Sequence, residues 1–198
     1  MNDIWIKTDY GKVFGQADGT IDGRLILAIH GYSQRNGWHT WKPMMAPLAA
    51  AGFRVVSVDM PGWGQSVATQ GQVDGEDAIQ CVLQILNGLD VETAVLMGKS
   101  WGGNVAVETA VSHPQRITHL ILTAPALRDV EQAKTITQPV LLTWAEDDPV
   151  IPFAYADRLA GAISNCQLET YSTGGHSAAP KNAGDFAPKA IEFLKRKK

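Results

Sequence analysis

Short apolar runs alternate along this chain with longer segments in which apolar residues recur at helical spacing. A short, continuous apolar run bounded by polar or turn residues is typical of a strand buried on both faces. Such runs predict strands over residues 24–29, 54–58, 94–97, 119–123, 140–144 and 167–171. Two further runs, 4–8 and 12–16, flank Tyr10-Gly11 and predict an antiparallel hairpin at the start of the chain.

The intervening segments have the spacing of amphipathic helices. In 77–87, for example, Ile79, Val82, Leu83 and Leu86 recur at three- and four-residue steps. The same kind of reading predicts helices over 41–51, 103–111, 153–163 and 186–195. Strands that alternate with helices in this way predict an α/β fold, with a mostly parallel, doubly wound sheet and helices on both faces. We expect one domain over residues 1–198.

Composition narrows the function classes without naming one. The net charge is −3, and basic residues are scattered apart from the run 195–198, which we interpret as a solvated helix end, so we expect no nucleic acid partner. The sequence shows no signal peptide and no apolar run long enough for a membrane span. Cys81 and Cys166 stand alone, which favours a cytoplasmic protein with free thiols, although a disulfide between them stays open. We expect a small-molecule substrate and a monomer or small homo-oligomer.

The segment 94–103, A-V-L-M-G-K-S-W-G-G, carries the most chemical information. An apolar strand runs into Gly98-Lys-Ser100-Trp-Gly102, and a helical pattern follows. Small residues two places before and two places after a serine allow a tight turn that exposes its hydroxyl at a helix N-terminus. The segment therefore predicts Ser100 as a nucleophile.

A serine hydroxyl is a poor nucleophile unless a base takes its proton, and the base needs a carboxylate to orient it. Histidine titrates in the right range to be that base. His176 follows the last predicted strand, and Asp147 and Asp148 follow the strand before it. Because the carboxyl ends of parallel strands share one edge of the sheet, these side chains are expected to meet Ser100 there.

Five segments together resemble the α/β-hydrolase fold superfamily over nearly the whole chain. They are H-G-Y at 30–32, D-M-P-G-W-G-Q-S at 59–66, G-K-S-W-G-G at 98–103, A-E-D-D-P-V-I-P at 145–152 and G-G-H at 174–176. The resemblance implies a central, mostly parallel sheet of the eight-stranded type, with a catalytic triad at its C-terminal edge. The family places its acid four residues before a proline, so Pro152 selects Asp148, with Asp147 as the alternative. Ala145 replaces the glycine that is usual in this loop.

The resemblance also assigns the other histidines and the oxyanion hole. His30 is similar to the family's structural histidine, which braces the oxyanion loop, and the backbone N–H groups of Tyr32 and Trp101 are the implied oxyanion donors. His39 lies in an aromatic-rich loop that is able to face the site. His113 and His119 stand at element ends, where surface or capping roles are usual.

Four further residues are candidates for lining the pocket: Ser33, Trp38, Trp63 and Lys99. Each also has a plainer interpretation. Ser33 is a common turn former, and a tryptophan is often simple packing. The Lys99 ammonium either favours an anionic substrate group or extends into solvent, and extension into solvent is the simpler interpretation.

The segment between the strands at 119–123 and 140–144 covers only residues 124–139, which is room for a loop and one or two helical turns. We therefore expect no sizeable cap domain and an open, shallow site, similar to that of small lidless serine hydrolases. The predicted function is a carboxylesterase-like serine hydrolase that works through an acyl-Ser100 intermediate, with no metal and no cofactor. The alternatives are an acyltransferase, thioesterase or perhydrolase with the same triad, or a non-catalytic binding protein on a hydrolase fold.

Overall fold

The computed structural model describes residues 1–127 and 129–196. Within them the strands form one mixed sheet. The strands are β1 (Asn2–Thr8), β2 (Gly11–Asp18), β3 (Leu25–Ile29), β4 (Arg54–Val58), β5 (Val67–Ala68), β6 (Ala94–Lys99), β7 (Ile117–Thr123), β8 (Val140–Ala145) and β9 (Cys166–Tyr171).

The strand order is β1-β2-β4-β3-β6-β7-β8-β9, and the short β5 pairs with β2. From β4 to β9 every pairing is parallel, whereas β1, β2 and β5 pair antiparallel. The parallel strands therefore present their carboxyl ends at one edge, where the loops after β3, β6, β8 and β9 gather.

The side chains of the central strands point alternately to the two faces of the sheet, which explains why both faces are covered. Leu25, Leu27 and Ile29 of β3 belong to one apolar core, and Ile26 and Ala28 belong to the other. Successive side chains of a strand point to opposite faces, so a continuous apolar run requires a helical layer on each side.

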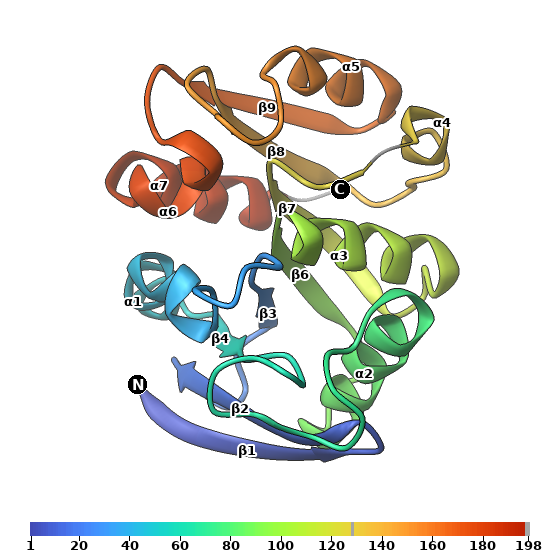
Figure 1. The fold of residues 1–198 in the computed structure, drawn as a ribbon. Helices are drawn as coiled ribbons and strands as arrows, with labels where there is room; N and C mark the ends of the chain where they lie inside the picture. Colours follow the sequence, from blue (N-terminus) through green and yellow to red (C-terminus); the bar gives the residue numbers. More distant parts are fainter. Residues whose placement is uncertain (128, 197–198) are drawn as a thin grey trace.

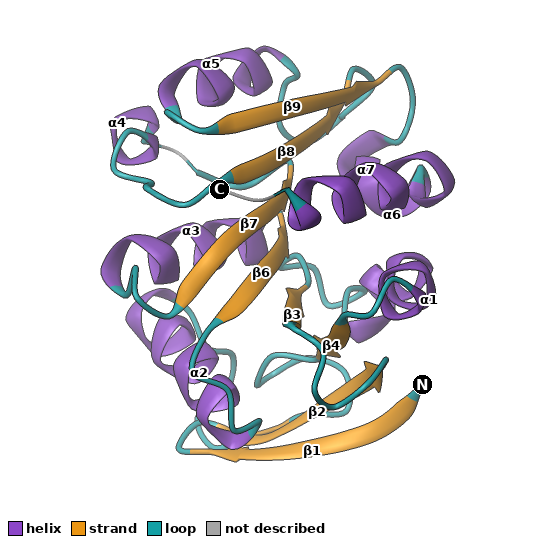
Figure 2. Cartoon of the chain, turned by 180° about the vertical axis from the view of Figure 1, so that it is seen from behind, coloured by secondary structure: helices purple, strands orange, loops and turns teal. Residues whose placement is uncertain are grey.

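Two layers of helices meet this requirement (Figures 1 and 2). Helices α2 (Gly75–Gly88), α3 (Trp101–Ser112) and α5 (Ala154–Ala162) pack on one face, and α1 (Lys42–Ala50) and α7 (Ala183–Lys195) pack on the other. The short α6 (Ala178–Lys181) joins the second layer, and α4 (Val130–Ala133) lies beside α5. The predicted α/β class and doubly wound arrangement are confirmed.

The predicted strands and long helices all occur, with bounds that shift by at most three residues. Four short elements were not predicted: β5, α6 and the two 3₁₀ turns η1 (Trp38–Trp41) and η2 (Gly175–Ser177). Two of them, η2 and α6, come directly after Gly174, between β9 and α7.

The connection between β7 and β8 carries no cap domain. Among its described residues, only the single turn α4 is helical, as the length of this segment predicted. In the described chain no helix is both long and apolar enough to cross a membrane. Cys81 and Cys166 are free thiols.

Candidate active site

The turn between β6 and α3 holds Ser100 in a strained conformation. Its backbone has φ 53° and ψ −119°, outside the regions that suit a residue with a side chain. The Ser100 amide donates to the carbonyl of Thr123 at 3.0 Å, and the Ser100 carbonyl accepts from Asn104 and Ala126. These bonds hold Ser100 at the start of α3, where the helix dipole favours negative charge.

The glycines of this turn are required by contact with backbone. A Cβ on Gly98 would lie 2.3 Å from the carbonyl oxygen of Gly102. A Cβ on Gly102 would lie 2.3 Å from the carbonyl oxygen of His30. Both distances are far below van der Waals contact, so the turn closes against the neighbouring strand only without side chains.

Asp148 and His176 meet from the loops after β8 and β9. The Nδ1 atom of His176 lies 2.8 Å from Oδ2 of Asp148, whose side chain is fully buried. The other carboxylate oxygen accepts from the amides of Val150 and Ile151, at 2.8 and 3.1 Å. The Nε2 atom of His176 is buried and has no hydrogen-bond partner among the described residues. With Nδ1 protonated toward Asp148, Nε2 keeps a free lone pair and is able to accept a proton.

Asp147 has a different partner. Its Oδ1 atom accepts a hydrogen bond of 2.6 Å from the backbone amide of Gly175, and the residue is exposed. Asp147 thus ties the loop after β8 to the loop after β9, and its neighbour Asp148 contacts the imidazole.

His30 braces the loop after β3. It is fully buried, and its Nδ1 atom lies 2.8 Å from the carbonyl oxygen of Gly31. Its Nε2 atom accepts from the amide of Met60 at 3.0 Å, so the proton of the neutral ring is on Nδ1. Burial lowers the pKa of His30 to about 4. A neutral ring that is hydrogen-bonded through both of its nitrogens is suited to structural support.

An aromatic cluster formed by Tyr32, Trp63 and Trp101 surrounds the two implied oxyanion donors. The rings of Trp63 and Trp101 stack at 4.9 Å, and Tyr32 packs edge-on against both. Trp63 Nε1 donates to the Tyr32 carbonyl at 2.8 Å, and Trp101 Nε1 donates to Asp74 at 2.8 Å. Trp63 is buried, while Tyr32 is 50% exposed, so the cluster presents the Tyr32 ring to solvent.

Three of the other predicted residues of this edge lie in the same loop. The Ser33 hydroxyl accepts from the Arg35 amide at 3.3 Å, as a turn former does. The Trp38 ring packs against the core that α1 and α7 cover. His39 is exposed and contacts the Arg35 carbonyl through Nε2.

The expectation that Lys99 extends into solvent is wrong. Lys99 is only 8% exposed, because it is the last residue of β6 and points to the face covered by α1 and α7. Its Nζ atom donates to Oδ1 of Asn36 at 3.4 Å. Sequence reasoning did not single out Asn36, which is a plain loop residue until its distant partner is known.

Asp59 is a second residue whose role the sequence left undefined. It is 1% exposed and accepts backbone hydrogen bonds from Trp38 at 2.6 Å and from Gln65 at 2.8 Å. These bonds join the loops after β3 and β4. The D-M-P-G-W-G-Q-S segment therefore supports the site, and its acid does not contact the His176 ring.

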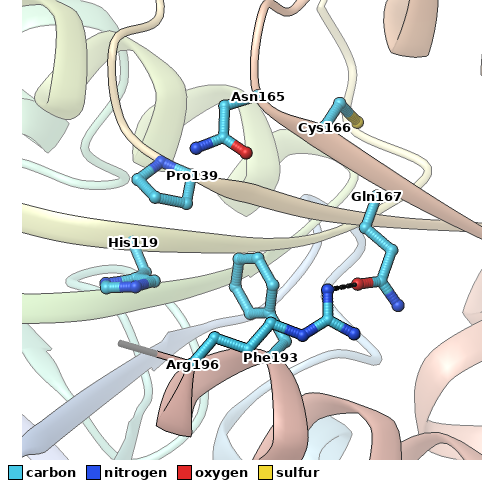
Figure 3. Close-up of a pocket in the computed structure, with 7 residues that line it drawn as sticks. All are labelled: His119, Pro139, Asn165, Cys166, Gln167, Phe193 and Arg196. Carbon is cyan, nitrogen blue, oxygen red and sulfur yellow. Dashed lines mark hydrogen bonds between the residues drawn. The ribbon is translucent and has the colours of Figure 1, made fainter. Parts of the chain in front are cut away.

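A cavity of about 300 Å³ lies at the opposite edge of the sheet (Figure 3). Its lining includes His119, Cys166 and Arg196, near the amino ends of β7 and β9 and the end of α7. His119, which was expected at the surface, is buried and packs edge-on against Phe193. None of the predicted site residues lines this cavity.

The family model described as alpha/beta hydrolase fold matches residues 24–134, more than half of the chain. The chain belongs to this family.

Relatives and solved structures match this chain over most of its length. A 2-hydroxy-6-oxononadienedioate/2-hydroxy-6-oxononatrienedioate hydrolase of Cupriavidus pinatubonensis is 24% identical, with 85% of this chain and 86% of the relative covered. A CIB-like hydrolase from Thermoplasma acidophilum has a TM-score of 0.89 at 26% identity, covering 98% of this chain and 97% of that one. The carboxylesterase CesB from Bacillus subtilis has the same TM-score at 18% identity, over 98% and 91% of the two chains. The chain is therefore a hydrolase.

Proposed function

We propose that this α/β hydrolase is a serine hydrolase that cleaves an ester-type bond through an acyl-Ser100 intermediate. The observation that carries the proposal is the pair His176–Asp148, at 2.8 Å, with the second imidazole nitrogen buried and unpartnered among the described residues. An imidazole held in one tautomer by a buried carboxylate is the base that a serine nucleophile needs.

In the first step, Ser100 attacks the substrate carbonyl carbon while Nε2 of His176 takes the hydroxyl proton. The Nδ1–H bond to Asp148 stabilises the imidazolium that forms. The proton then passes to the leaving alcohol as the C–O bond breaks, which leaves an ester on Ser100. Water attacks this ester with His176 again as the base, and the acid product and free Ser100 result.

We assign stabilisation of the negative charge on each tetrahedral intermediate to the backbone amides of Tyr32 and Trp101. The strained turn at Ser100 and the His30 bonds to Gly31 and Met60 support this assignment, because they fix both loops without using the two amides. One such donor contributes about 3 kcal/mol of transition-state stabilisation.

A fluorophosphonate probe tests the proposal directly. We expect the folded wild-type protein to be labelled at Ser100, Ser100→Ala to lose labelling, and His176→Ala to be labelled far more slowly. A Ser33→Ala variant is the matched control, because Ser33 lies in the same site region and its hydroxyl accepts a turn hydrogen bond from the Arg35 amide. Absence of labelling in a folded sample would contradict the proposal.

Turnover of a panel of esters, thioesters, lactones and amides then assigns the bond type. Ester-type cleavage predicts the fastest turnover with esters and release of the free acid. Accumulation of an acyl group on an added alcohol or thiol, with no free acid, would indicate an acyltransferase.

A further inference from the structure

Lys99 and Asn36 form a polar pair beside the nucleophile that the proposed mechanism leaves without a role. Lys99 is 8% exposed, and its bond to Asn36 Oδ1 is long, at 3.4 Å. Lys99 pairs with Thr123 across the sheet, and Thr123 pairs with Thr143. The hydroxyls of both threonines are buried without partners among the described residues. A buried ammonium in such surroundings is costly, and this cost calls for a function.

The ammonium decides which way the Asn36 amide faces. A lysine side chain only donates hydrogen bonds, so the atom of Asn36 that meets Lys99 must be the carbonyl oxygen. The hydroxyl of Thr40 also points to this oxygen, at 3.5 Å. The NH₂ group of Asn36 is therefore turned away from Lys99 and Thr40.

That NH₂ group and the Ser100 side chain both lie next to Gly31. A Cβ placed on Gly31 would lie 3.4 Å from Nδ2 of Asn36 and 3.5 Å from Cβ of Ser100. The two side chains thus flank the same small space above Gly31, which has no side chain of its own to fill it. The hydrogen bonds of Asn36 to other described side chains are both at Oδ1, so the two Nδ2 donors remain available to a bound molecule.

We propose that the side-chain amide of Asn36 donates a hydrogen bond to an acyl oxygen of the substrate bound at Ser100, and that Lys99 is the positioning residue that fixes its direction. The inference rests on the proposed serine hydrolase function. It deepens that function by adding a side-chain donor to the two backbone donors. It also describes the substrate further: its acyl oxygen lies in the space over Gly31.

The net effect of its surroundings is to lower the pKa of Lys99. Burial lowers the pKa of Lys99, the Asp148 carboxylate raises it, and Lys181 lowers it again. Asp148 is already bonded to His176 and two backbone amides. The Lys99 ammonium has its hydrogen bond with Asn36 instead.

Asn36→Asp and Asn36→Ala test the donor. Asn36→Asp keeps the size and an acceptor for Lys99 but removes the NH₂ group, so it should preserve folding and lower kcat/KM for esters by roughly 10–100-fold. Asn36→Ala should give a similar loss. Gln34→Ala is the matched control, because Gln34 is an exposed amide in the same loop, and its kcat/KM should stay within about twofold of the wild type.

A double-mutant cycle tests the role of Lys99. Lys99→Met removes the ammonium at nearly constant size and should lower kcat/KM about tenfold in the wild-type background, but less than twofold in the Asn36→Ala background. A structural role of Lys99 would give the same loss in both backgrounds. The melting temperature of each variant is measured alongside to identify variants that fail to fold.

The labelling endpoint with the fluorophosphonate probe separates this inference from the proposed function. If wild-type Ser100 is not labelled, the proposed function fails. If Ser100 is labelled but folded Asn36→Asp retains wild-type kcat/KM, the donor inference is overturned. Equal effects of Lys99→Met in both backgrounds would overturn the positioning role alone.

Discussion

At the level of single residues, two adjacent aspartates differ in chemistry because successive loop residues point in different directions. Asp148 is fully buried, and its carboxylate is held by the imidazole and two amides. Asp147 is exposed, and its one hydrogen bond within the described part of the chain is with the Gly175 amide. The spacing to Pro152 favoured Asp148 in the sequence, and Asp148 is the aspartate that contacts His176.

Asparagine substitutions are expected to separate these aspartates. Asp148→Asn should lower kcat by about 10⁴-fold, because an amide fails to hold the imidazole in the tautomer that accepts the Ser100 proton. Asp147→Asn keeps an oxygen for the Gly175 amide and should change kcat by less than roughly tenfold. Steady-state kinetics on an activated ester measures both. A larger loss in Asp147→Asn would reverse the assignment of the acid.

His30 illustrates how burial sets a residue's charge. Its pKa is lowered to about 4, while in the unfolded chain it has the ordinary value near 6.5. Below pH 6.5 the unfolded state binds a proton that the folded state does not bind. The neutral His30 therefore supports the fold fully above pH 6.5, and this support is lost as the pH falls toward 4.

The expected consequence is a pH-dependent loss of stability. Between pH 6.5 and 4 the free energy of unfolding should fall by about 3 kcal/mol more in the wild type than in a His30→Gln variant, since a shift of one pKa unit equals about 1.4 kcal/mol. Urea unfolding at several pH values measures the difference. His39→Gln, at an exposed position, is the control and should follow the wild-type curve. Parallel curves for wild type and His30→Gln would contradict the buried neutral ring.

The sequence did not reveal the contacts of residues that act through distant partners. Asn36 and Lys99 are far apart in the chain, as are Asp59 and Trp38, and each pair meets only when the loops at the carboxyl edge fold together. The residues of the proposed triad were identifiable because local spacing and motif context mark them. Side-chain burial, as at Lys99, depends on which helices cover the strand end, and a single sequence does not fix that.

At the level of elements, the strand–turn–helix around Ser100 works because two glycines let backbones touch. The long strands and helices were predictable, since apolar runs and helical spacing of apolar residues extend over many residues. The short elements β5, α6, η1 and η2 have too few residues for a period, and their positions follow from contacts with neighbouring loops.

Alanine substitutions at two glycines should therefore have opposite effects. Gly98→Ala places Cβ 2.3 Å from a backbone oxygen and is expected to lower the free energy of unfolding by more than about 3 kcal/mol, or to prevent folding. Gly161→Ala, in helix α5 with open space around it, should raise stability by about 0.5–1 kcal/mol. Chemical denaturation measures both. A stable, active Gly98→Ala variant would show that the turn has room to move.

At the level of the whole molecule, the described residues place no inserted domain over the carboxyl edge of the sheet. The connection between β7 and β8 contributes one described helical turn, α4, and that turn packs beside α5 on one flank (Figure 1). A deep acyl pocket needs walls from an inserted domain, because the sheet and its two helical layers are already packed by their own apolar side chains.

This architecture predicts a weak dependence on acyl-chain length. Each methylene that becomes fully buried contributes about 0.8 kcal/mol, or close to a fourfold gain in kcat/KM, in an enzyme that encloses the chain. Methylenes beyond the first few would stay in water here, so kcat/KM for p-nitrophenyl esters should level off after short chains and vary less than about tenfold from acetate to octanoate. A steady rise of several fold per added methylene would require an enclosing wall and would contradict the open site.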